Sequence, residues 1–320
     1  MTKILNKKYS ILFIVNLLIV LNVDILQAQK YAADFLNIGV GARALGMGSA
    51  YVAISNDATA AYWNPAGLSQ LHKREITIMH ANRFSGLVQT NFINLAIIDK
   101  HGNAFALSYF RVGIDDIPKS TKLDEFDRPI IEKYIQDVEQ ALFLSFARKN
   151  SNNFSLGGNL KAIFQKVGDH SSLGLGFDIG ALYCLSPHLS FGVSLQDLAG
   201  TYIFWDTGHR DVKYPTIVWG LAFSHNVPIL SGKTTLAINN NIRFEGQNNE
   251  NLFSLGEIAG YDVNLGGEYV LLNTIAFRVG MERKNLTAGA GLRLRFFEID
   301  YAFVSYDLGN THRISGKILF

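Results

Sequence analysis

Cysteine is nearly absent from this sequence, with Cys184 as the single example among 320 residues. A lone cysteine cannot form an internal disulfide, which excludes a disulfide-stapled fold. Cys184 stands in a strand-like run, so we interpret it as a small apolar side chain rather than a reactive thiol. The eight histidines are scattered, and no pair has the helical spacing of metal ligands. We therefore expect neither a metal site nor a cofactor.

Charged residues are also scarce, at 18% of the chain, whereas 48% of the residues are hydrophobic and 29 are glycine. This composition is unusual for a soluble protein and normal for a β-barrel that shows apolar side chains to lipid. Without residues 1–28, which hold three lysines and Asp24, the 29 basic and 27 acidic residues become 26 of each. A net charge near zero gives no reason to expect a nucleic-acid partner.

Long apolar runs are missing as well, apart from the N-terminus. Lys3, Lys7 and Lys8 precede an apolar run from Ile11 to Leu21, and Ala28 supplies a small residue for cleavage. The run is about half of the roughly 20 residues that a membrane-spanning helix needs. We interpret residues 1–28 as a secretory signal peptide cleaved near Ala28, in preference to a membrane anchor.

From residue 74 onward the chain divides into short segments of alternating hydrophobicity. Leu286, Ala288, Ala290, Leu292, Leu294 and Phe296 alternate with Thr287, Gly289, Gly291, Arg293 and Arg295. A strand of about ten tilted residues covers the roughly 25 Å apolar band of an outer membrane. The predicted strands are 74–84, 88–99, 103–113, 137–149, 153–167, 172–186, 188–198, 214–225, 233–245, 262–272, 273–283, 285–296, 297–306 and 311–320.

The connections between these strands support the same fold. The longest links, near 114–136, 199–213 and 246–261, all fall at one end of the alternating strands, and most turns at the other end are short. Transmembrane barrels have long outer loops and short periplasmic turns. The sequence therefore predicts an all-β, antiparallel up-and-down transmembrane barrel of about fourteen strands over residues 74–320. The junctions near 272 and 296 leave twelve strands open.

The last predicted strand is amphipathic and ends in an aromatic residue. Ile314, Gly316, Ile318 and Phe320 share one face, opposite Arg313, Ser315, Lys317 and Leu319. Such an ending resembles the signal that barrel-assembly machinery recognises in bacterial outer-membrane proteins. Together with the predicted signal peptide, it predicts the outer membrane of a Gram-negative bacterium as the location, with outer-membrane lipid around the barrel.

Residues 29–73 do not follow the strand pattern and are rich in glycine and alanine. Asp57 could cap a short helix over Ala58 to Trp63, and Pro65 and Gly67 should end it. Small residues allow a backbone to pack closely against a barrel wall, so we expect an N-terminal helical plug inside the barrel. Gly39-Val-Gly-Ala and Gly46-Met-Gly-Ser look like fragments of a nucleotide-binding loop, but no βαβ unit follows them.

Two motifs in this segment carry a family resemblance. Arg43-Ala-Leu-Gly-Met-Gly-Ser-Ala-Tyr-Val-Ala and Asn56-Asp-Ala-Thr-Ala-Ala-Tyr-Trp-Asn-Pro-Ala-Gly-Leu resemble the PorV/PorQ group of outer-membrane proteins, within the FadL/toluene-transporter superfamily. The superfamily's hatch carries an Asn-Pro-Ala motif that matches Asn64, Pro65 and Ala66, followed here by Gly67. The ending Asp307-Leu-Gly-Asn-Thr-His-Arg-Ile-Ser resembles the family's last hairpin.

The resemblance implies a fourteen-stranded barrel with an N-terminal hatch and two alternative functions. The main interpretation is a PorV/PorQ-like interaction component of type IX secretion that binds the translocon or the C-terminal signal domains of cargo, and the alternative is transport. A FadL-like protein would passively transport hydrophobic small molecules, such as fatty acids or aromatics, held in its lumen. The oligomeric state stays open in both interpretations.

Other residues favour ordinary barrel roles. We expect Lys161, Arg293, Arg295, Glu298 and Asp300 to face the lumen and pair with one another, although a channel role is an alternative. Aromatic residues at strand ends are typical of interfacial girdles; these are Tyr109, Tyr183, Trp219, Tyr301 and Tyr306. The link at 114–136 is interpreted as a solvated outer loop, with partner binding as the alternative. No nucleophile-elbow motif is present, so we expect no enzyme activity.

Overall fold

The computed structural model describes residues 32–228, 231–244, 253–255, 259–307 and 309–320. The predicted signal peptide lies outside the described residues. Within them, no helix combines the length and apolar character that a membrane-spanning helix needs.

Fourteen long antiparallel strands form a single closed barrel. The ring closes where β1 pairs with β19, with Glu75 opposite Leu319 and Asn82 opposite His312. Every predicted strand is present, which confirms fourteen strands and excludes twelve. In order around the ring, the strands are β1 (Glu75–Arg83), β2 (Val88–Ile98), β3 (Asn103–Lys119), β6 (Lys133–Lys149), β7 (Phe154–Val167), β8 (His170–Cys184), β9 (Leu189–Gln196), β12 (Thr216–Val227), β13 (Gly232–Arg243), β15 (Ala259–Leu271), β16 (Ile275–Glu282), β17 (Asn285–Arg293), β18 (Phe297–Val304) and β19 (Thr311–Leu319).

The alternation read from the sequence corresponds to the two faces of the wall. In β19, Thr311, Arg313, Ser315 and Lys317 are buried inside the barrel, whereas Ile314 and Ile318 are exposed on the outside. Successive side chains of a strand point to opposite faces, so each strand supplies both a lipid-facing and a lumen-facing row. The outer ring of apolar side chains places the barrel in an outer membrane.

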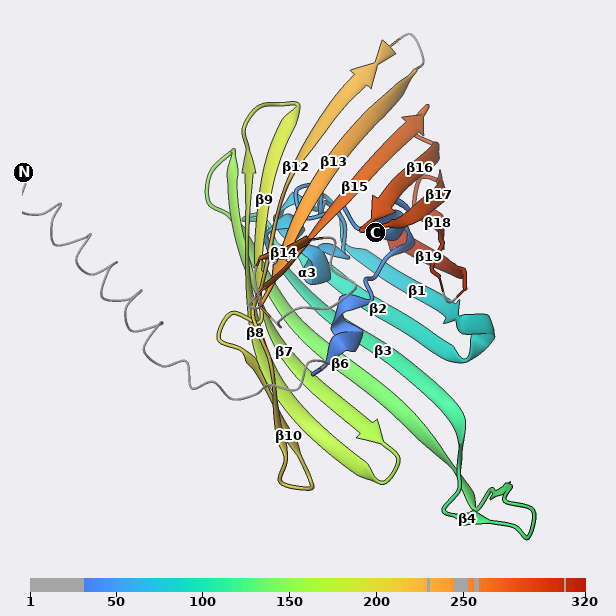
Figure 1. Cartoon of the computed structure of the whole chain (residues 1–320). Coiled ribbons are helices and arrows are strands. Elements are labelled where there is room, and N and C mark those ends of the chain that lie inside the picture. The colour runs from blue at the N-terminus through green and yellow to red at the C-terminus, as the bar shows by residue number, and fades with distance from the viewer. Residues whose placement is uncertain (1–31, 229–230, 245–252, 256–258, 308) are drawn as a thin grey trace, which may run out of the picture.

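Two predicted outer loops are largely strand. Where a loop was predicted over 114–136, β3 and β6 continue as paired strands to Lys119 and Lys133, with an irregularity between Ile114 and Ile117. A small hairpin of β4 (Lys122–Leu123) and β5 (Pro129–Ile130) forms the tip, and we call residues 114–136 the arm. The arm extends well beyond the rest of the wall (Figure 1). The prediction of a loop was wrong because water reaches both faces of the arm, so its strands need no alternation of apolar and polar residues.

The second of these links, at 199–213, folds as β10 (Thr201–Trp205) and β11 (Arg210–Lys213), which prolong β9 and β12 toward the same end (Figure 1). In the third link, the described residues include β14 (Phe253–Leu255), which pairs with β15. A short turn, η3 (Phe84–Gly86), joins β1 to β2. The arm and the β10–β11 hairpin mark the extracellular end, because outer-membrane barrels carry their longer connections outside.

The segment before β1 lies inside the ring of strands as a plug (Figure 1). It comprises η1 (Asp34–Asn37), α2 (Ala42–Gly46), α3 (Ala60–Trp63) and η2 (Pro65–Gln70). The predicted helix at 58–63 begins two residues later, at Ala60. Asp57 Oδ1 accepts a hydrogen bond from the backbone N–H of Thr59 at 3.0 Å, which supports the turn that precedes the helix.

Candidate functional site

Asn64, the first residue of the predicted hatch motif, is fully buried between the plug and the wall. Its amide nitrogen donates to Val52 O at 2.9 Å and to Ala181 O of β8 at 3.1 Å. Its amide oxygen accepts from the backbone N–H of Ala66 at 3.2 Å and so caps η2. Pro65 takes the first helical position, where its missing N–H costs nothing. One side chain therefore joins two plug segments to the barrel.

The backbone of the hatch motif lies directly against glycines. A Cβ on Gly180 of β8 would lie 2.2 Å from Asn64 Oδ1, and one on Gly157 of β7 would lie 2.5 Å from the backbone of Pro65 and Ala66. Within the plug, a Cβ on Gly67 would overlap the Ser55 carbonyl oxygen. Only glycine fits at these three positions.

The same arrangement recurs around the barrel. Five further wall glycines bring the wall so close to plug backbone or side-chain atoms that a Cβ would lie within about 3.2 Å of them: Gly192, Gly220, Gly266, Gly280 and Gly289. The sequence indicated small residues in the plug, and the structure shows that the wall is matched to them. This fit holds residues 46–66 tightly.

Charged side chains form a second attachment on the periplasmic side of the plug. Arg43 of α2 makes a bidentate ion pair with Glu268 of β15, at 2.9 and 2.8 Å. The carboxylate of Glu268 also contacts Arg278 Nε at 2.7 Å, and Arg278 reaches Asp300 at 2.8 Å. Arg293 lies 3.4 Å from Glu268. Arg43 therefore links the plug to a buried network of charged side chains on the wall.

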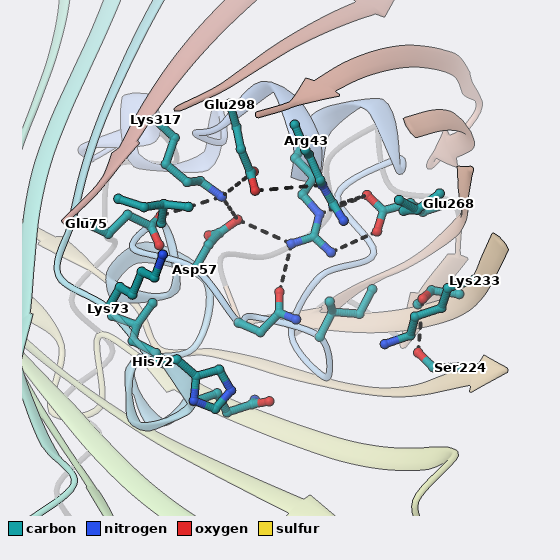
Figure 2. Close-up of a pocket in the computed structure, with 18 residues that line it drawn as sticks. Arg43, Asp57, His72, Lys73, Glu75, Ser224, Lys233, Glu268, Glu298 and Lys317 are labelled. Carbon is teal, nitrogen blue, oxygen red and sulfur yellow. Dashed lines mark hydrogen bonds and ion pairs between the residues drawn. The ribbon is translucent and has the colours of Figure 1, made fainter. Parts of the chain in front are cut away.

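A second plug residue, Asp57, joins the network from the other side (Figure 2). Lys317 of β19 lies 3.3 Å from Asp57, 3.6 Å from Glu75 and 3.1 Å from Glu298. Arg43 is 3.5 Å from Asp57, and the Tyr51 hydroxyl donates a hydrogen bond to the Asp57 carboxylate at 2.7 Å. We call Arg43, Asp57, Glu268 and Lys317 the latch.

The latch keeps the Asp57 carboxyl ionised. Burial alone would raise the pKa of Asp57, but Lys317, Arg43 and hydrogen bonds from Thr59 and Tyr51 outweigh it and hold the pKa well below its usual value. Attachment of the plug to the wall therefore favours the ionised carboxylate more strongly than water would.

A cavity of about 320 Å³ lies beside the latch. His72, Lys73 and Lys233 also line it and surround the ion pairs, as Figure 2 shows. The lining is strongly charged and of mixed sign, which suits water rather than an apolar ligand.

The lumen on the extracellular side of the plug has one apolar wall. The inward-facing side chains there form a continuous buried cluster of Met79, Phe92, Phe110, Phe143, Ile163 and Ile203, from β1, β2, β3, β6, β7 and β10. Phe35 of η1 stacks on Phe110, with 5.8 Å between ring centroids, and Tyr62 meets Phe110 and Phe143 edge to face. The N-terminal part of the plug therefore fills an apolar space.

The opposite side of this lumen is polar. A cavity of about 60 Å³ lies between the plug and amide side chains, which include Gln196, Asn239, Asn241 and Asn264. This cavity shares no lining residue with the cavity beside the latch. The two lie on opposite sides of the plug.

The predicted lumen charges mostly occupy the predicted places. Lys161 is buried beside Asp178, at 2.7 Å, and Asp197. Arg293, Glu298 and Asp300 belong to the network described above. All four therefore face the lumen in ion pairs, but only Arg293 and Glu298 pair with each other, at 3.9 Å. Arg295 is an exception: it lies exposed in the β17–β18 turn, with its guanidinium over the ring of Phe296.

The aromatic residues divide in the same way. Tyr109, Tyr183, Trp219 and Tyr301 point outward from their strands, as a girdle requires. The prediction for Tyr306 was wrong, because it lies in the β18–β19 connection and donates inward to Glu282 at 3.0 Å. At the other end of the strand pair, Phe320 exchanges backbone hydrogen bonds with Arg74. In the described part of the chain, no group of three His, Cys, Asp or Glu residues is arranged to hold a metal ion.

Sequence reasoning missed the latch. Arg43 and Asp57 stood in the quoted motifs, but their wall partners Glu268 and Lys317 are more than 200 residues away in the chain, and no local pattern pairs them. The one available signal was that a charge inside a segment of small residues needs a buried partner.

Solved structures with a similar architecture include a transporter and a channel. No protein-family model and no curated protein sequence matches the chain. The Ralstonia pickettii toluene transporter TbuX superposes with a TM-score of 0.59 at 12% identity, over 88% of this chain and 98% of its own. The CymD monoaromatic hydrocarbon channel gives 0.58 at 13%, and a Pseudomonas aeruginosa FadL homologue 0.52 at 14%, both over 88% of this chain and 98% of theirs. At these identities the likeness establishes a FadL-like fold.

Proposed function

We propose that this barrel passively transports hydrophobic small molecules across the outer membrane. The observation that carries the proposal is the apolar inner wall formed by Phe92, Phe110 and Phe143 with their neighbours. Lumens that conduct water and ions are polar, whereas this wall would desolvate an apolar ligand. The FadL-like fold supports the same function, since its solved examples include a toluene transporter.

The plug would then act as the gate, and its two parts have different attachments. Residues 42–66 are fixed by wall glycines and by the latch, whereas η1 contacts the wall mainly through Phe35 and Leu36. An apolar ligand can replace these contacts with similar ones, so displacing η1 costs little free energy. We therefore expect η1 to be the first part of the plug to move. In this proposal Asn64, Pro65, Ala66 and Gly67 hold the rest of the hatch in place.

The test compares wild type with Phe35→Ala and Phe110→Gln. We expect purified wild type to bind toluene or a long-chain fatty acid, with a change in the fluorescence of Trp63 and Trp205, which adjoin the apolar cluster. Phe35→Ala vacates space on the plug and should tighten binding severalfold. Phe110→Gln places an amide in the apolar wall and should weaken it by about tenfold, because an unsatisfied buried amide costs roughly 1–3 kcal/mol.

Phe105→Gln is the matched control, because Phe105 lies on the same strand but faces outward. It should leave ligand binding unchanged. Uptake in a host without its own hydrocarbon transporter supplies the functional readout. Equal uptake with and without the barrel, or saturable passage of a sugar of similar size, would contradict transport of hydrophobic molecules.

The second candidate is a protein-interaction role in type IX secretion, for which the PorV/PorQ-like motifs are the sequence argument. The structural observation that favours it is the firm attachment of the plug between two separate cavities. A barrel with a fixed plug is better suited to holding a protein than to passing a solute. Copurification with the translocon or with cargo signal domains, and loss of surface-protein export on deletion, are expected; normal export after deletion contradicts this role.

A further inference from the structure

The outward face of the barrel changes from apolar to polar partway along β19, β1, β2 and β3. One row of paired residues runs His80, Asn91, Arg111, and the adjacent row runs His312, Asn82, Gln89. We call these six residues the polar patch. The next row toward the periplasm is Ile78, Ile93, Tyr109, so the change is abrupt.

The apolar band beneath the patch is too short for a membrane. On β7, outward apolar side chains run from Phe154 to Phe164, which at about 3.3 Å per residue and a tilt near 40° covers roughly 25 Å. On β2 they run only from Ile93 to Ile97, which covers roughly 10 Å by the same geometry. Asp99 and Lys100 follow directly at the periplasmic end. The patch therefore lies at a depth where the wall at β7, three strands from β2 around the ring, meets lipid.

Lipid is a poor neighbour for this surface. His80 Nδ1 lies 2.8 Å from Asn91 Oδ1, and His312 Nδ1 lies 2.6 Å from the Tyr301 hydroxyl, so these polar groups are satisfied in part. Asn82 and Gln89 face outward beside them. Arg111 approaches Asp115 only to 4.0 Å. Polar groups that lack partners in hydrocarbon cost several kcal/mol each, so the surface needs a neighbour that can form hydrogen bonds.

The arm extends from β3 and β6, next to the polar patch. Its mismatch is the reverse of the patch's, because apolar side chains lie where water is expected. Four of its apolar side chains stand in water at exposures of 52–74%: Leu123, Phe126, Ile131 and Tyr134. Exposed apolar groups next to a polar surface at membrane depth mark a place where another protein packs. Lipid could cover the patch with headgroups but would leave the tip of the arm in water.

We propose that the polar patch and the arm together bind a second copy of this chain. Two copies inserted in the same direction are related by a two-fold axis along the membrane normal, which brings both patches to the same depth. The amide and imidazole groups of five patch residues both donate and accept hydrogen bonds, and they supply acceptors for Arg111, which only donates. The patch is therefore chemically complementary to itself, as an isologous contact requires. The proposal is independent of what passes through the lumen.

Cross-linking tests the geometry in native membranes. In a Cys184→Ser background, Asn82→Cys places a thiol in the patch, and Leu175→Cys places one on the outward face of β8, away from the patch around the ring. We expect a bifunctional maleimide to give a cross-linked dimer with Asn82→Cys and none with Leu175→Cys. Equal cross-linking of both, or of neither, overturns the proposal.

A second variant tests the chemistry. His80→Leu, Asn82→Ile, Gln89→Leu and Asn91→Val together extend the apolar band by two rows and should give a monomer by mass in lipid nanodiscs, where wild type gives a dimer. Heat-dependent migration on gels reports whether the variant folds. Should it fail to fold, removal of residues 120–131 from the arm provides the alternative, with at least a tenfold weaker dimer expected.

Three results overturn the proposal. If wild type is monomeric in nanodiscs of every acyl-chain length, the proposed contact between two copies does not form. A monomer that prefers short-chain lipids, with the preference lost in the fourfold variant, shows that headgroups cover the patch. A stable complex with a different membrane protein through Asn82, without dimer, assigns the surface to that partner.

Discussion

Glycines on the inner face of the wall make room for the plug. Gly157, Gly192 and Gly266 stand where the barrel approaches plug backbone, and a Cβ at each would lie about 2.5 Å or less from a plug backbone atom. Such overlap cannot be relieved by a rotamer change, because the atoms on both sides are largely backbone. These wall glycines, part of the glycine-rich composition that indicated a barrel, therefore also help to fix the position of its plug.

Gly266 and Gly267 allow this to be tested with neighbouring residues. A Cβ on Gly266 would lie 2.3 Å from Met47 O, whereas one on Gly267 has no neighbour closer than 3.6 Å. We expect Gly266→Ala to lower the stability of the plugged state by about 1–3 kcal/mol, seen as faster protease cleavage within residues 42–71. Gly267→Ala should leave the cleavage rate unchanged, and equal rates for the two variants would contradict a close fit.

At the scale of elements, the sequence predicted the strands well because lipid and lumen impose a strict alternation. Leu286 to Leu292, for example, can face lipid only if Thr287 and Gly289 face inward. The arm was missed because water surrounds both of its faces and no alternation is required there. Arg295 and Tyr306 were misplaced for a related reason: each stands just past a strand end, where the period of two no longer fixes direction.

The candidate site was less predictable than the fold. Asn64 could be singled out by its motif, but its contact with Ala181 depends on which strand lies beneath the plug. The latch depends on pairs such as Arg43 and Glu268, whose separation in the chain leaves no periodic signal. A single sequence therefore predicted the strands and the plug segment, but not the side-chain contacts between them.

Arg43 fixes the plug as an element, and its removal should loosen the plug. Arg43→Met leaves the buried Asp57 and Glu268 with fewer partners, and breaking a buried ion pair in this way costs roughly 3–5 kcal/mol. Because Glu268 keeps Arg278 and Arg293, we expect a loss of about 3 kcal/mol, measured as a lower denaturant midpoint for protection of residues 42–71. Lys284→Met, which disrupts the exposed pair with Asp307, should change the midpoint little.

For the whole molecule, the plug divides the lumen into regions of unlike chemistry. The periplasmic side holds the latch and a charged cavity, whereas the extracellular side is apolar on one wall and rich in amides on the other. Ion pairs respond to pH and salt, and apolar contacts respond to apolar ligands. The two ends of the plug are therefore expected to loosen under different conditions.

Acid should release the latch end before the barrel unfolds. The latch holds the pKa of Asp57 well below its usual value, whereas in a released plug that pKa returns to about 4. A carboxyl whose pKa is lowered in the attached state stabilises attachment fully above about pH 4 and progressively less as the pH falls toward its lowered value. We expect hydrogen exchange in residues 52–60 to accelerate between about pH 4 and 2 while β7 and β8 stay protected. Asp57→Asn should remove most of this acceleration, since the amide does not titrate; an unchanged acid response in that variant would show that Asp57 is not the group that titrates.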